Sequence, residues 1–293
     1  MGWRTSNNHG HDDDDSSAPG QDFGSWVWTA SHDAHSGLLP FDFAKGGKPG
    51  GGGGGPPGGG GGGGGILTSY TSGDAGEYNI NVVFQGGNWT TALQHAFIVA
   101  ADQLSDYIIG DIVDVGLIDD ISIYASVVRI DGPGRILGQA GPTDLRAGSF
   151  LPDTAIMQFD VADATNYDGK GLFDDIVMHE MLHSIGFGTI WSDLNLLSGA
   201  GTSNPTFTGS QAVAAYHLVY PLAPAGNIPV EQDGGAGTRD SHWDDLKFGN
   251  ELMTGYINTN NDLSYMTIAS LADLGYKLDP LLDDTPFTSP AWI

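Results

Sequence analysis

A run of glycine divides this chain of 293 residues into two unequal parts. Residues 50–65 are all glycine except Pro56 and Pro57, so the run has no apolar side chain to bury. Segments of this composition form no packed core and behave as flexible linkers. We therefore predict a polar, acidic N-terminal tail over residues 1–49, a disordered linker over residues 50–65, and one folded region over residues 66–293.

Acidic side chains outnumber basic ones by 36 to 10, which gives a formal net charge of −26. A surface of this sign repels phosphate, so we expect neither nucleic acid nor an anionic membrane as a partner. The absence of cysteine excludes disulfide scaffolds, thiol nucleophiles and Cys-ligated zinc sites. No apolar run approaches the roughly 20 residues that cross a bilayer, so we expect no membrane span.

The folded region has the pattern of an α+β protein. Three stretches combine alternation with β-branched residues and predict strands: residues 78–85, 121–130 and 156–161. Residues 91–109 carry apolar side chains at three- and four-residue spacing, which predicts a long amphipathic helix. After the third strand we expect a polar loop. Residues 172–185 then return to helical spacing and end at Gly186, a residue suited to a helix C-cap.

This second helix contains the pattern His-Glu-x-x-His over residues 179–183. Two histidines four residues apart project from one helix face, so His179 and His183 can bind one zinc ion at about 2.0–2.1 Å. Glu180 lies beside that face and can reach a water on the metal. The pattern also arises by chance in unrelated helices. Here, apolar neighbours such as Val177 and Leu182 can bury the opposite face of the helix, which favours a metal site over a chance match.

A catalytic zinc ion usually has three protein ligands, so another segment must supply the third. In the compact pattern His-Glu-x-x-His-x-x-Gly-x-x-His it would fall at Thr189. The glycine of that pattern is present as Gly186. Six residues further along the chain stay open as candidates: His217, His242, Glu231, Asp240, Asp244 and Asp245. Glycines before His242 and the large ring of Trp243 after it favour His242, because they allow a turned, anchored loop.

Three motifs in this order resemble the leishmanolysin family of metzincin peptidases. They are residues 179–188 (HEMLHSIGFG), 241–243 (SHW) and 250–255 (NELMTG). In that family an insertion separates the glycine turn from the third zinc histidine, which precedes a Met-turn. The resemblance spans about residues 78–280. It implies His242 as the third ligand, Met253 as the methionine beneath the zinc ion, and a cysteine-free homologue of bacterial type.

The same resemblance implies a metzincin-like zincin fold. Its N-terminal subdomain, about residues 66–188, would hold a twisted mixed sheet and two long helices beside an active-site cleft. Residues 189–293 would form the insertion and a C-terminal subdomain with the Met-turn and a helix. The implied function is a zinc-dependent endopeptidase that binds one Zn²⁺ and hydrolyses protein or peptide substrates with zinc-activated water and Glu180 as general base. The family also implies secretion, although no N-terminal signal peptide is recognisable.

Acidic residues before the second helix predict a further, structural Ca²⁺ site, because oxygen ligands suit calcium. The candidates are Asp160, Asp163, Asp168, Asp174 and Asp175. A solvated acidic loop at a helix N-terminus explains them equally well. Two alternatives to a peptidase also stay open. One is a non-catalytic calcium-binding or interaction protein on a peptidase fold, and the other is a zinc hydrolase acting on non-peptide amides.

Overall fold

The structure is a computed structural model, which describes residues 26–30 and 65–284. For residues 26–30 it describes the backbone alone. Most of the predicted tail 1–49 and all but the last residue of the predicted linker 50–65 therefore lie outside the described residues.

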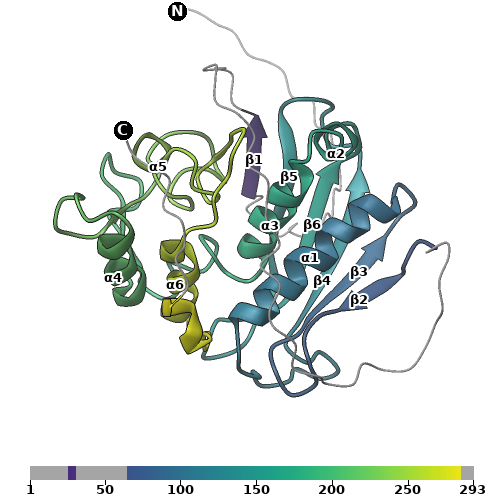
Figure 1. Ribbon diagram of the computed structural model, residues 1–293, viewed down its shortest axis with the longest axis horizontal. Helices are drawn as coiled ribbons and strands as arrows, with labels where there is room; N and C mark the ends of the chain where they lie inside the picture. Colours follow the sequence, from purple (N-terminus) through teal and green to yellow (C-terminus); the bar gives the residue numbers. More distant parts are fainter. Residues whose placement is uncertain (1–25, 31–64, 285–293) are drawn as a thin grey trace, which may run out of the picture.

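A seven-stranded mixed sheet forms the centre of the fold, in the order β10-β1-β5-β6-β4-β3-β2 (Figure 1). Its strands are β1 (Trp26–Ala30), β2 (Ser69–Thr71), β3 (Ile80–Gln85), β4 (Ile121–Val128), β5 (Ile136–Leu145), β6 (Pro152–Asp160) and β10 (Tyr256–Ile257). β4 pairs in parallel with both β3 and β6, whereas β5 pairs antiparallel with β6 and with β1. The predicted α+β class with a mixed sheet is confirmed.

Six helices accompany the sheet in the part of the chain that the structure describes. They are α1 (Thr91–Tyr107), α2 (Val161–Asp168), α3 (Phe173–Ser184), α4 (Ser210–Val219), α5 (Asp245–Phe248) and α6 (Tyr265–Leu274). α1 and α3 lie across the sheet, and α4 and α6 pack together beside it (Figure 1). The chain also contains a small sheet of β7 (Leu197–Ser198), β8 (Thr206–Phe207) and β9 (Ile228–Pro229), and a 3-10 helix, η1 (Pro280–Asp284).

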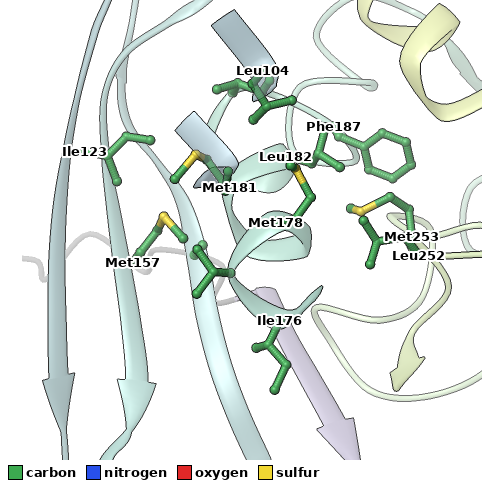
Figure 2. Close-up of a cluster of buried hydrophobic side chains, with 14 of the residues drawn as sticks. Leu104, Ile123, Met157, Ile176, Met178, Met181, Leu182, Phe187, Leu252 and Met253 are labelled. Atoms are coloured by element: carbon green, nitrogen blue, oxygen red, sulfur yellow. The ribbon is translucent and has the colours of Figure 1, made fainter. Parts of the chain in front are cut away.

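The core lies between the sheet and the two long helices. Figure 2 shows Ile123 of β4 and Met157 of β6 on the sheet side, with Met181 of α3 packed among them. Leu252 and Met253 lie on the other side of α3, beside Phe187. The apolar core thus continues past α3 into the C-terminal part of the chain, and every residue of α3 from Ile176 to Ser184 is buried.

The prediction of a polar loop after residue 161 is wrong, because the chain there forms α2. The Asp160 carboxylate caps this helix by accepting a hydrogen bond from the backbone N–H of Ala162 at 2.8 Å. β5 was not predicted, since Gly138, Gly141 and Pro142 weaken its strand pattern. β1 falls within the predicted tail, yet its backbone joins the sheet.

Candidate active site

Three histidine side chains meet at the C-terminal end of α3. The Nε2 atom of His183 lies 3.0 Å from that of His179 and 2.9 Å from that of His242, and the remaining pair is 3.1 Å apart. All three side chains are buried. Nitrogen ligands at 2.0–2.1 Å from one tetrahedral zinc ion lie roughly 3.3 Å from one another, so this triangle is close to the spacing of a metal site. The sequence alone left His242 as one candidate among six, and the structure brings it to the helix.

The second ring nitrogen of each histidine lies next to a backbone carbonyl oxygen. The acceptors are Leu252 for His179 (2.8 Å), Phe187 for His183 (2.9 Å) and Thr238 for His242 (3.0 Å). A carbonyl only accepts, so these contacts place a proton on each Nδ1 and leave a lone pair on each Nε2. Three lone pairs that converge on one point repel each other unless a cation lies between them, which is the arrangement expected of metal-binding imidazoles.

Burial keeps these imidazoles uncharged at neutral pH. It lowers the pKa of His183 to about 4. Burial, and then the neighbouring imidazoles, lower the pKa of His179 and of His242 well below the usual range. Neutral imidazole is the form that binds a metal, so the site needs no deprotonation before an ion enters.

The carboxylate of Glu180 is fully buried beside the three histidines, and neither oxygen has a hydrogen-bond partner among the residues that the structure describes. Burial raises its pKa well above the usual range. Gly138 of β5 makes room for it, because a Cβ at that position would lie 3.0 Å from Glu180 Oε1 and 3.1 Å from Phe159 Cδ1. An unsatisfied buried carboxylate is costly, so it calls for a partner that enters the site, such as a water or a substrate group.

Two glycines after α3 let the chain turn towards His242. Gly186 has φ +115° and Gly188 has φ +72°, both in the left-handed region that favours glycine. A Cβ at Gly188 would lie 2.2 Å from the carbonyl oxygen of Ser241, so the two backbones touch there. Trp243 then anchors the His242 segment, because its Nε1 donates to Thr267 Oγ1 at 2.8 Å and its ring packs against Phe187.

The segment that holds the Leu252 carbonyl is fixed by Glu251. Glu251 Oε2 accepts the backbone N–H of Met253 at 2.5 Å. Oε1 accepts the hydroxyl of Ser264 at 2.8 Å and also that of Thr267. Met253 itself is fully buried. Sequence reasoning missed Glu251, Gly138 and the three carbonyl acceptors. Backbone acceptors leave no signature in a sequence. Glu251 lies in the NELMTG motif, so its position beside Met253 could have indicated a structural role.

The other candidates for the third ligand have different partners. His217 Nε2 lies 3.1 Å from the carbonyl oxygen of Gly226, and Asp240 accepts the backbone N–H of Gly201 at 2.9 Å. Glu231 accepts the backbone N–H groups of Asp233 and Asp245. Asp244 precedes α5 as its N-cap residue, and Asp245 begins that helix. Within residues 26–30 and 65–284, none of these side chains belongs to a group able to hold a metal ion.

The five carboxylates considered for calcium are not gathered into one group by the structure. Asp160 accepts the backbone N–H groups of Ile130 (2.7 Å), Asp131 (3.1 Å), Gly132 (3.0 Å) and Ala162 (2.8 Å), and Asp163 accepts that of Gly134 at 2.9 Å. Asp175 accepts the amide of Asn261 at 2.9 Å, while Asp168 and Asp174 lie on helices α2 and α3. Asp160 and Asp163 thus act as acceptors for a turn and a helix, so the structure gives the calcium site no support.

The sequence model of the leishmanolysin peptidase family matches residues 114–279 of the chain, a stretch that contains the whole of α3, the three histidines and Met253. A search among curated proteins gives no match. The family match covers more than half of the chain and includes the helix and the loop that form the three-histidine site. The chain belongs to the leishmanolysin family of metallopeptidases.

Proposed function

We propose that this protein is a zinc-dependent endopeptidase in which His179, His183 and His242 hold one zinc ion and Glu180 is the general base. The observation that carries this proposal is the convergence of three Nε2 lone pairs within 3.1 Å of one another, beside a buried carboxylate. The family match supports a metallopeptidase, and the donor set of three neutral imidazoles fits zinc.

A zinc ion bound by these imidazoles would supply the positive charge that acidifies a water molecule and polarises a peptide carbonyl. Glu180 then accepts a proton from the attacking water and delivers it to the leaving amine. Burial raises the pKa of this carboxyl well above its usual range, and the positive charge of the ion would act against that rise and favour the ionised base. The fixed Nδ1 contacts hold the rings in place, so little reorganisation is needed during the reaction.

The metzincin details form part of the same proposal. Met253 is the floor residue below the metal, supported by its burial and by the Glu251 contact to its backbone. Residues 66–188 form the N-terminal subdomain and residues 189–293 the insertion and C-terminal subdomain.

Substrates are proteins or peptides that reach the enzyme outside the cell. In the described part of the chain, no helix has both the length and the apolar character needed to cross a membrane.

A non-catalytic protein on a peptidase fold is disfavoured. Loss of activity usually leaves a gap in the ligand set or at the base, whereas here the three histidines lie together and Glu180 is beside them.

Replacement of Glu180 by Gln tests the proposal, since it keeps the shape of the side chain and removes the base. We expect casein cleavage to fall by about 10²- to 10⁴-fold, with one zinc ion per chain retained. The exposed Glu77→Gln is the matched control and should keep full activity. Full activity in Glu180→Gln, or a wild-type chain without stoichiometric zinc, would contradict the assignment.

A further inference from the structure

Strand β1 lies between two strands that come from different parts of the fold. It pairs antiparallel with β5, where Trp28 is opposite Gly138 and Val27 is opposite Gln139. It pairs in parallel with β10, where Thr29 is opposite Tyr256. In the strand order, β1 is the element that joins β5 to β10 (Figure 1). Without it, β5 would be the edge of the sheet.

Both strands that pair with β1 are connected with the three-histidine site. Gly138, the partner of Trp28, is the residue whose missing Cβ makes room for Glu180. β10 begins at Tyr256, shortly after Met253 in the same segment. The backbone of β1 therefore runs between the strand next to the general base and the segment that follows the Met253 turn.

The side chains of the site are buried in this arrangement. Glu180, His179 and His242 have no exposed surface, and His183 is 1 % exposed. A peptidase must present its general base and its metal to a substrate, so the segments around these side chains control access to the site. An unpaired strand edge is a template for an extended peptide, which gains main-chain hydrogen bonds by adding to the sheet. The edge of β5 beside Glu180 offers such a template, and β1 covers it.

We propose that Trp26–Ala30 is an internal occupant of the path that a substrate strand takes, and that the full chain is latent until this segment leaves. The inference rests on the proposed peptidase function. Because occupant and site belong to one chain, their pairing is intramolecular and competes with dissolved substrate at high effective concentration. Such a device needs no thiol, which suits a chain without cysteine.

The test weakens the backbone pairing of β1 in the full chain. Successive N–H groups of a strand point to opposite neighbours, so prolines at Val27 and Trp28, which both lie opposite β5, remove the donor of this pair that points towards β5. The control carries Ser16→Pro and Ser17→Pro, two prolines in the predicted tail but outside β1. Both chains are assayed for casein-type peptide hydrolysis, and amide hydrogen exchange is measured over residues 136–140.

When an occupant competes with substrate, the apparent KM equals the intrinsic KM divided by the fraction of open chains, and kcat is unchanged. We therefore expect Val27→Pro/Trp28→Pro to lower the apparent KM about tenfold or more at constant kcat, with faster exchange over residues 136–140. The control should match the wild type. Unchanged KM and exchange, or a folded variant with reduced kcat, would show that β1 is a permanent strand of the peptidase and overturn the proposal. If neither chain cleaves peptide although zinc is bound, the proposed function fails, and the exchange result still decides whether β1 covers β5.

Discussion

The Nδ1 atom of His179 lies 2.8 Å from the carbonyl oxygen of Leu252, a residue 73 positions further along the chain. This contact ties the orientation of a proposed metal ligand to a turn in the C-terminal part of the fold. Glu251 holds that turn through the backbone N–H of Met253. The charge state of Glu251 therefore affects both the stability of the turn and the support of the ligand.

Replacement of Glu251 by Gln is expected to flatten the pH dependence of stability. Burial raises the pKa of Glu251 to about 7, against the opposing hydrogen bonds from Thr267, Ser264 and Met253. The folded state thus binds more protons than the unfolded state between about pH 4.5 and 7, so the free energy of unfolding falls as pH rises through this window and is level above it. At about 1.4 kcal/mol per pKa unit, Glu251 alone contributes a loss of about 3 kcal/mol.

Urea unfolding at pH 5 and pH 8 measures this difference. The change between the two pH values should be smaller in Glu251→Gln than in the wild type, while the exposed Glu77→Gln keeps the wild-type change. An identical change in all three proteins would assign the pH dependence to other groups.

Gly138→Ala is expected to lower activity without removing the metal. The new methyl group would lie 3.0 Å from Glu180 Oε1 and 3.1 Å from its Cγ, which is too close, so the carboxylate must shift by a few tenths of an ångström. A displaced general base should reduce kcat about tenfold, because proton transfer depends on position. Zinc content and kcat are measured together. Gly87→Ala, where a Cβ meets nothing within 4 Å, is the control, and equal kcat in both variants would show that Glu180 tolerates the methyl group.

His242→Ala should weaken zinc binding by more than about 100-fold, since loss even of a hydrogen-bond partner of a ligand costs 10- to 100-fold. Competition with a zinc chelator at pH 7.5 gives the affinity. His217→Ala is the matched control, because His217 contacts the Gly226 carbonyl and lies outside the three-histidine group. Equal affinities in the two variants would remove His242 from the ligand set.

Asp160→Ala is expected to destabilise the fold by about 3 kcal/mol, because it removes a helix N-cap and the acceptor of three further backbone N–H groups. The loss should be the same with calcium or with EGTA when zinc is kept saturating, measured by thermal unfolding. Asp168→Ala, an exposed residue of the same acidic stretch, should change stability little. A melting temperature of the wild type that falls in EGTA would restore the calcium interpretation.

Local patterns predicted the elements that carry most of the chemistry. The spacing of apolar residues places a helix at residues 172–185, and the structure has α3 at Phe173–Ser184. The cap of α1 is a local feature of the same kind, since Thr90 Oγ1 accepts the N–H of Leu93 at 3.1 Å. Both features depend on residues within one or two turns of each other, so they can be predicted from a single sequence.

Features that depend on residues far apart in the chain could not be predicted from the sequence. The acidic residues before α3 suggested a metal, but the acceptor role of Asp160 depends on a turn that lies 28 to 30 residues away. β5 contains Gly138 because Glu180 occupies the space where a side chain would be, and its pairing with β6 and β1 makes it a strand all the same. Among six candidates for the third ligand the sequence favoured His242, but the contacts that bring it to α3 depend on a loop that follows the insertion.

The contact between Gly188 and Ser241 has a consequence for engineering this fold. Because a Cβ at position 188 would lie 2.2 Å from the Ser241 carbonyl oxygen, the two main chains approach as closely as bare backbone permits. The close approach of the His242 segment to the turn after α3 thus depends on a residue that contributes no side chain. Transplanting the histidines into another scaffold would reproduce their chemistry but not their spacing, unless the recipient also left this gap unfilled.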